Sequence, residues 1–263
     1  MSAGTRKLIE FENVTVHRGG HAALREVTFS IEEGQHTALL GPNGSGKSTL
    51  IHAITRECYP RYAPPECKLR IWGQERWRLF DLRALFGIVT NDLVERCVKP
   101  YPALETALSG FFGSIGIWPN HIVTPEMEVK ARQALEFFDI GHLAERPLTE
   151  MSSGEVRRAV FARALVHDPK ALILDEPTNS LDVRAQREVR DAMRKLAANG
   201  VTVILVTHHL PDIIPEIGRI ITLREGRLFH DGPKEQALRP EALSELFGVD
   251  VRVAESDGYY HMW

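Results

Sequence analysis

Apolar and polar residues follow two different patterns in the parts of this chain that have β character. Three early segments are short and are separated by turn residues such as Gly19-Gly20 and Glu33-Gly34, which predicts an antiparallel β-layer. These segments are residues 8–11, 14–16 and 27–31. Three later segments are apolar on consecutive residues, as in strands buried on both faces of a parallel sheet. They are residues 38–40, 171–174 and 201–206.

Helical spacing replaces this pattern between residues 92 and 150, where Pro119 and Pro125 mark breaks. The apolar residues that repeat at this spacing are Met127, Ala131, Ala134, Leu135 and Phe138. Strand character returns at 220–223 and 227–229, on either side of a predicted tight turn at Glu225-Gly226. We therefore predict an α/β fold with a mostly parallel sheet, an N-terminal antiparallel β-layer and an inserted helical subdomain.

Composition narrows the class of protein. A chain of 263 residues with 43% hydrophobic residues is long enough for one large α/β domain, and a net charge of −3 argues against nucleic acid as the main ligand. Three cysteines without CxxC spacing predict free thiols, and the amino end has no signal-peptide core. The most membrane-like stretch, residues 107–118, is too short to span a bilayer. We expect a cytoplasmic chain that reaches a membrane only through a partner.

A phosphate-binding loop follows the apolar run at 38–40. Residues 41–48 fit G-x-x-x-x-G-K-[ST], and the chain continues as a predicted helix from Thr49. Glycines let consecutive N–H groups face phosphate oxygens, while Lys47 places a charge near the β- and γ-phosphates and Ser48 is the expected hydroxyl ligand of Mg²⁺. The predicted nucleotide-binding residues are Gly41, Pro42, Asn43, Gly44, Ser45, Gly46, Lys47, Ser48 and Thr49.

Two adjacent carboxylates end the run at 171–174. Asp175 is predicted to hold the metal or its waters, and Glu176 to reach the attacking water. An acidic pair can also simply cap a strand, but this alternative is weak beside a phosphate loop.

The segment Met151-Ser152-Ser153-Gly154-Glu155 permits two interpretations. Ser152 and Glu155 have the S-x-x-E spacing of a capping box, which indicates an ordinary helix start. The same helix end, with its free N–H groups, also suits a γ-phosphate. The residues alone leave both open.

Five motifs occur in the order found in ATP-binding cassette ATPases, and the resemblance covers nearly the whole chain. The phosphate loop, Ser152–Glu155, Asp175-Glu176, Ser180-Leu181-Asp182 and Thr207-His208 are similar to the Walker A, signature, Walker B, D-loop and switch-histidine motifs. The resemblance implies a P-loop NTPase core in a single nucleotide-binding domain over residues 1–263. Its β-layer and ATPase core would comprise 1–90 and 159–263, and its helical subdomain 91–158.

The resemblance also implies how the site works. Two cassettes would form a head-to-tail homodimer or heterodimer that encloses two ATP molecules. Ser152 and Gly154 would contact the γ-phosphate held by the other subunit, and His208 the γ-phosphate in its own. Lys47, Glu176 and His208 would carry catalysis, with Mg²⁺ near Ser48, Asp175 and Asn91.

Three positions depart from the family pattern. Ser153 stands where the signature has its first glycine, and it adds a side chain at a crowded place. Asn91 stands at the usual glutamine, one methylene shorter, which puts its reach to Mg²⁺ or to the attacking water in question. His17-Arg18 occupies the place of the aromatic residue that stacks on adenine, where the Arg18 guanidinium could stack instead.

We weighed three functions. The first is the ATPase subunit of a membrane transporter with separate transmembrane permease subunits; residues 106–118 and the Val206–Leu210 run loosely resemble a subgroup linked to molybdate or other metal-ion uptake. The second is a soluble cassette ATPase acting on ribosomes or DNA repair. Such proteins often have two cassettes or long coiled coils, and this chain has neither. The third is a dimerisation module with negligible turnover, which Glu176 and His208 argue against.

Overall fold

The computed structural model describes residues 6–61 and 66–263. The chain divides into two compact units, Met1–Leu82 with Thr202–Trp263, and Arg83–Val201. Predictions that fall on residues 1–5 and 62–65, including that part of the domain limits, lie outside the described residues. Within the described ranges, no helix has both the length and the apolar composition needed to cross a membrane.

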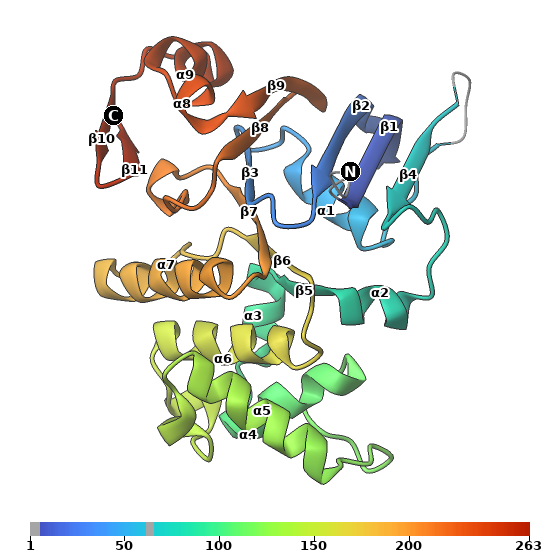
Figure 1. The fold of residues 1–263 in the computed structure, drawn as a ribbon, viewed down its shortest axis with the longest axis vertical. Helices are drawn as coiled ribbons and strands as arrows, with labels where there is room; N and C mark the ends of the chain where they lie inside the picture. The colour runs from blue at the N-terminus through green and yellow to red at the C-terminus, as the bar shows by residue number, and fades with distance from the viewer. Residues whose placement is uncertain (1–5, 62–65) are drawn as a thin grey trace, which may run out of the picture. The chain divides into compact units, whose positions relative to one another are not determined.

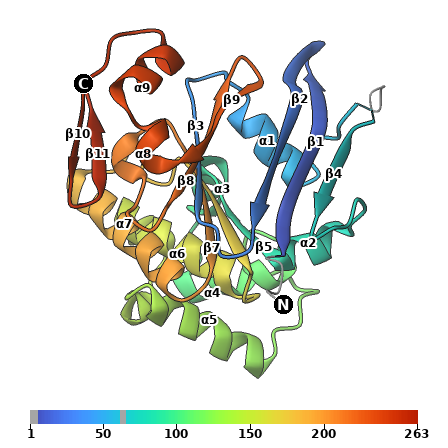
Figure 2. The same cartoon turned by 45° about the horizontal axis from the view of Figure 1, so that its top comes forward.

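An antiparallel sheet in the first unit confirms the predicted β-layer (Figure 2). Its strands, in spatial order, are β2 (His21–Glu32), β1 (Lys7–Arg18) and β4 (Lys68–Ile71). The predicted strands at 8–11 and 14–16 are one strand, because β1 continues through a register shift beside Asn13, whose φ is 52°. Gly19 and Gly20, with φ of 57° and 83°, turn the chain from β1 into β2.

The first unit also contains parallel strands. In spatial order they are β7 (Thr202–Thr207), β3 (Thr37–Leu40) and β8 (Arg219–Arg224). The edge strand β9 (Arg227–Pro233) follows and pairs with β8 in the antiparallel direction. Every residue of β3 and β7 is buried, as continuous apolar runs predict. Glu225 and Gly226, with φ of 52° and 77°, make the predicted turn between β8 and β9. The other elements are α1 (Lys47–Ile54), η4 (Leu210–Asp212), α8 (Lys234–Ala237), α9 (Pro240–Phe247), β10 (Val253–Ser256) and β11 (Tyr259–Met262).

The second unit combines two parallel strands with most of the helices. Helices α4, α5 and α6 pack side by side in it (Figure 1). The predicted break at Pro125 is a helix boundary: Pro125 is the first residue of α5, where its missing N–H costs nothing. Thr124 caps the helix by accepting from Met127 N–H at 3.3 Å. The strands are β5 (Phe86–Val89) and β6 (Ala171–Asp175). The helices are α3 (Asn91–Cys97), α4 (Ala103–Leu108), η1 (Ser109–Phe112), α5 (Pro125–Phe137), η2 (Gly141–Leu143), η3 (Leu148–Glu150), α6 (Ser153–Leu165) and α7 (Val183–Ala198), and α2 (Leu79–Leu85) leads into the unit.

The predicted α/β class is confirmed, with parallel strands, an N-terminal antiparallel sheet and a helical region. The predicted helical subdomain, 91–158, falls inside the second unit. Its limits, and the single-domain organisation, remain predictions. Cys58, Cys67 and Cys97 are free, as their spacing predicts.

Candidate functional site

The loop between β3 and α1 needs glycine because its backbone touches other backbone segments. A Cβ on Gly41 would lie 2.3 Å from the Leu223 carbonyl oxygen, and one on Gly46 would lie 2.7 Å from that of Ala23. Gly46 also has φ of 107°, which side chains disfavour. The turn between β8 and β9 supports the loop, since Gly226 N–H donates to the Ser45 carbonyl at 3.0 Å. These contacts fix the loop shape that precedes α1.

Lys47 begins α1 and turns its ammonium back onto the loop. Its Nζ donates to the Gly41 carbonyl at 2.7 Å and to the Pro42 carbonyl at 3.1 Å, and the side chain is buried. Ser48, the next residue, is exposed, whereas Thr49 is buried. A held cation beside an exposed hydroxyl at a helix N-terminus is an arrangement suited to an anion.

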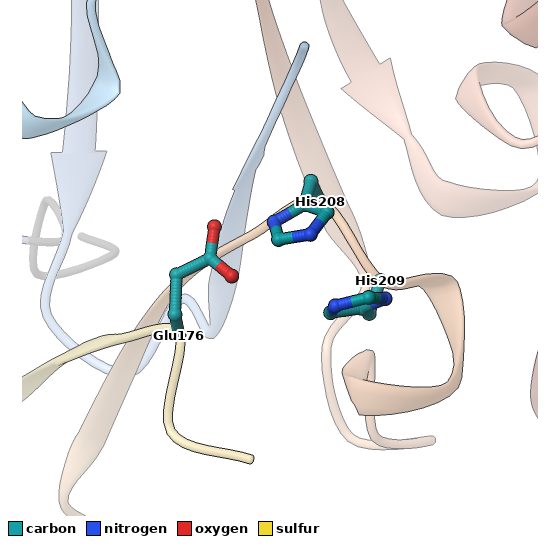
Figure 3. A group of neighbouring side chains, drawn as sticks. All are labelled: Glu176, His208 and His209. Atoms are coloured by element: carbon teal, nitrogen blue, oxygen red, sulfur yellow. The ribbon is translucent and has the colours of Figure 1, made fainter. Parts of the chain in front are cut away.

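Histidines follow β7 in the first unit. The rings of His208 and His209 lie 3.9 Å apart at 41° to one another (Figure 3). The Thr207 hydroxyl holds the chain where it leaves β7. It accepts from His209 N–H at 2.9 Å and donates to the buried Asp212 carboxylate at 3.3 Å. Sequence reasoning overlooked Thr207 and Asp212 as supports of the predicted histidine. Their polar side chains in an apolar surrounding were the available signal.

The predicted adenine contact, Arg18, is exposed at the end of β1, as is His17. Both side chains are accessible.

The acidic pair lies in the second unit, where β6 ends. Glu176 has φ of 51°, so the regular alternation of side chains along β6 stops between Asp175 and Glu176. Its carbonyl oxygen accepts from Asn179 N–H at 3.1 Å, which closes a turn after the strand. The carboxylate of Glu176 is drawn in Figure 3. The predicted separation of roles between two adjacent carboxylates therefore has a backbone basis.

The helix start at Ser152 is the capping box that its spacing predicts. The Ser152 hydroxyl accepts from Glu155 N–H at 3.3 Å, and the Glu155 carboxylate accepts from Ser152 N–H at 2.8 Å. Desolvation acts to raise the pKa of Glu155, but the hydrogen bonds with Ser152 and the nearby charges of Arg158 and Arg146 together outweigh it, and the pKa is lowered. The anion-binding interpretation of this helix end stays a prediction.

The two residues after Ser152 differ sharply in burial. Ser153 is exposed, while Gly154 is buried against α7. A Cβ on Gly154 would lie 3.1 Å from the Ala185 Cβ and 3.3 Å from the Glu188 carboxylate. Packing against α7 therefore favours glycine at position 154. Ser153 is exposed, so its side chain is accommodated.

Asn91 is the first residue of α3, directly after its cap Thr90. Its side-chain oxygen accepts from Arg157 Nη1 at 2.7 Å, and Arg157 Nη2 donates to the Asn179 carbonyl at 3.3 Å. Arg157 is a further residue that sequence reasoning missed. No local pattern marks it, because an arginine on a helix is ordinarily exposed.

The predicted site residues thus fall into two groups. The phosphate loop, Arg18 and His208 belong to the first unit, and the other five to the second. Those five are Asn91, Ser152, Gly154, Asp175 and Glu176. The first group offers a cation, a hydroxyl and the N-terminus of α1; the second offers carboxylate and carboxamide oxygens.

Comparison with known sequences finds one family and many relatives. The profile of the family described as ABC transporter matches residues 24–179. The chain is 31% identical to an uncharacterised ABC transporter ATP-binding protein, YlmA, of Bacillus subtilis over 94% of this chain and 93% of the relative. It is 33% identical to the phosphonates import ATP-binding protein PhnC of Shigella dysenteriae (95% and 97% covered) and 30% identical to the hemin import ATP-binding protein HmuV of Bradyrhizobium diazoefficiens (95% and 92% covered).

Solved structures show the same fold. The structure of cbiO1 from Clostridium perfringens, part of the ABC transporter complex cbiONQ, matches with a TM-score of 0.76 and 25% identity, over 91% of this chain and 94% of that one. The dimeric structure of MJ0796, a bacterial ABC transporter cassette, matches with a TM-score of 0.67 and 26% identity, over 86% and 98%.

Proposed function

Since the chain belongs to the ABC transporter family, in which it is an ATP-binding subunit, we propose that it hydrolyses ATP at residues 41–49 and Glu176 to drive import through a membrane partner. The observation that carries this proposal is the Lys47 ammonium, held against the loop carbonyls at the start of α1. A fixed charge there suits the β- and γ-phosphates of a nucleotide.

We assign a separate task to each side chain. Lys47 and the loop N–H groups bind the phosphates, and Glu176 orients and deprotonates the attacking water. His208 contacts the γ-phosphate. Arg18 or His17 faces the adenine.

Mg²⁺ fits the donors that this chain offers. Hydroxyl and carboxylate oxygens are the ligands it prefers, and Ser48 and Asp175 supply them. When bound, the ion neutralises charge that develops on the phosphates. Asn91 is the weakest of the proposed ligands, because one lone pair of its oxygen already accepts from Arg157.

We propose that two cassettes close on ATP, as two copies meet in the dimeric structure of MJ0796. Ser152 and Gly154 would then face the γ-phosphate bound by the partner subunit. The closed form is a homodimer of this chain or a heterodimer with a second cassette.

The transporter partner is a separate transmembrane permease, so that the chain works at the inner face of the membrane. Residues 91–118 are the proposed docking region, and they expose apolar side chains: Trp118 is 59% exposed and Val98 41%. Crosslinks from a purified complex should map to this segment. Crosslinks confined to the antiparallel sheet would contradict it.

For the cargo we propose a metal ion or metal chelate. The loose resemblance of 106–118 and 206–210 to cassettes for molybdate or other metal ions favours it, as does the likeness to a hemin import protein. The phosphonate relative represents the competing class of cargo. Molybdate, metal chelates and phosphonates are supplied in turn to the reconstituted transporter, and molybdate or a metal chelate should stimulate ATP hydrolysis more than a phosphonate does.

The alternative is a cassette ATPase that serves a non-transport assembly. A gene for a protein with several apolar spans of about 20 residues beside the gene for this chain would favour transport. Copurification of the chain with ribosomes or DNA-repair proteins would favour the alternative.

The decisive test of hydrolysis is Glu176→Gln. This change removes a negative charge and a proton acceptor but keeps the shape, so ATP binding should survive while turnover falls by about 10²-fold or more. Since ATP binds the closed dimer, the slow variant should accumulate as an ATP-bound dimer in light scattering. Glu241→Gln, the same change at an exposed position on α9, is the matched control. Fast hydrolysis in Glu176→Gln would remove Glu176 from the mechanism; slow hydrolysis without a dimer would reject the homodimer alone.

A further inference from the structure

A buried arginine, Arg157, lies on α6. Arg157 is only 5% exposed, and within the described part of the chain its guanidinium forms no ion pair with a carboxylate. Its Nε finds no hydrogen-bond acceptor there either. Burial lowers the pKa of Arg157, because desolvation penalises the charged form. A buried charge left without a counter-charge is costly, so an arginine at this place calls for a reason beyond packing.

The two bonds of Arg157 go to segments that the proposed mechanism uses. Nη1 donates to the side-chain oxygen of Asn91 at 2.7 Å, within the range of a strong charge-assisted bond. Nη2 donates to the main-chain carbonyl of Asn179 at 3.3 Å. One rigid, planar guanidinium thereby connects α6 to the start of α3 and to the turn after β6.

That turn carries Glu176. Asn179 N–H donates to the Glu176 carbonyl at 3.1 Å, so Arg157 holds one end of a turn whose other end bears the carboxylate. Glu176 and Ser180 both have left-handed backbone, with φ of 51° and 62°. Left-handed residues other than glycine persist only where the surroundings hold them, and the bond from Arg157 is one such restraint.

The bond to Asn91 orients its carboxamide. One lone pair of the side-chain oxygen accepts from Arg157, so the second lone pair and the amide nitrogen remain for other contacts. Asn91 is thus held at a defined orientation although it is one methylene shorter than glutamine.

We infer that Arg157 is a positioning residue for ATP hydrolysis: its guanidinium holds the Asn91 carboxamide and the Glu176 turn in fixed relation to α6. The inference rests on the proposed roles of Asn91 and Glu176. It adds that α6, which begins with the Ser152 capping box, is tied to both of them by one side chain. A shift of α6 would therefore displace the turn that carries Glu176.

The test compares kcat and KM for ATP in Arg157→Met, which keeps the length of the side chain and removes its donors. We expect kcat to fall about tenfold or more while KM changes by less than about threefold, since the phosphate loop is untouched. Arg132→Met is the matched control: Arg132 lies on the exposed side of α5 and pairs with Glu128 at 2.9 Å. It should keep wild-type kcat and KM.

A double-mutant cycle separates positioning from a general loss of structure. If Arg157 acts through Asn91, the two changes Arg157→Met and Asn91→Ala should together cost clearly less than the product of the single losses in kcat. Independent, multiplicative losses would overturn the inference, as would a wild-type kcat in Arg157→Met. If Arg157→Met does not fold, the cycle is run with Arg157→Lys, which keeps the charge but lacks the planar fork, and the same criterion applies.

The outcomes also separate this inference from the proposed function. Loss of hydrolysis in Glu176→Gln together with multiplicative losses in the cycle rejects the role of Arg157 alone. Unchanged hydrolysis in Glu176→Gln rejects the proposed mechanism whatever the cycle shows.

Discussion

Replacing Gly154 tests whether this glycine of the signature motif stabilises the folded chain in the absence of nucleotide. In Gly154→Ala the new Cβ would lie 3.1 Å from the Ala185 Cβ on α7. Carbon atoms pack at about 3.5–4.0 Å, so α6 and α7 would have to separate by roughly 0.5 Å. The second neighbour, the Glu188 carboxylate at 3.3 Å, also accepts from Arg158 and Arg184, which restricts its movement.

Two effects of opposite sign decide the magnitude. Overpacking of a tight contact costs about 1–3 kcal/mol, whereas alanine in place of glycine in a helix gains at most about 1 kcal/mol. The packing cost wins, and we expect a net loss of about 1 kcal/mol in the free energy of unfolding, or about 2–4 °C in Tm for a chain of this size.

The assay is thermal unfolding without nucleotide, so that contact with a partner's phosphate cannot contribute. Ser153→Ala, one residue earlier and exposed, is the control and should stay within about 0.5 kcal/mol of wild type. Ala185→Gly in the Gly154→Ala background removes the atom that the new Cβ meets, so the double variant should be less destabilised than the sum of the single changes. A Gly154→Ala protein as stable as wild type would refute the packing argument.

The remaining predictions concern nucleotide binding, turnover and pH. Lys47→Ala should nearly abolish ATP binding, because no other side chain of the motif replaces its charge; wild-type affinity in isothermal titration would contradict the site assignment. Ser153→Gly should leave turnover unchanged or raise it, since the removed side chain would face the partner's γ-phosphate; a collapse of activity would make the hydroxyl itself a phosphate ligand. His36 accepts from Val203 N–H through Nδ1 at 3.1 Å, and burial lowers its pKa below the usual 6.5. The stability that neutral His36 contributes is therefore full above pH 6.5 and is lost as pH falls from there through the lower folded pKa. Denaturation measured at each pH should show that the free energy of unfolding falls less over this window in His36→Gln than in wild type. An equal fall in both proteins would exclude His36 as the cause.

Local sequence predicts the loops, turns and helix starts whose backbone conformation depends on particular residues at fixed spacing. The phosphate loop, the turn at Glu225-Gly226 and the capping box at Ser152 each need particular residues at fixed spacing, and each has the predicted form. For the turn and the capping box, the required contacts lie within a few residues along the chain, so a pattern in one segment is sufficient. The glycines of the phosphate loop also meet the distant carbonyls of Leu223 and Ala23, but their fixed spacing marks the loop without those neighbours.

The short strands were missed because tertiary packing decides them. β5 contains Gly87, which in isolation resembles a strand breaker, yet a Cβ there would lie 2.7 Å from the Ala164 carbonyl on α6. β4 has only four residues, and two of them, Lys68 and Arg70, are charged. β4 alternates polar and apolar residues but is too short to predict a strand without its neighbours, and β5 lacks the alternation.

Arg157 shows that local sequence patterns also fail to predict some residues that matter for function. The proposed reactive groups stand where elements begin or end, at Asn91, Ser152 and Glu176, and such places can be recognised from local pattern. What holds them is a side chain from the second turn of α6, whose burial depends on segments up to 66 residues away in the chain. Because a guanidinium can donate to several acceptors at once, one such residue can fix distant ends that no local motif connects. It follows that a motif in correct order predicts which atoms react, while the accuracy of their placement depends on residues outside every motif.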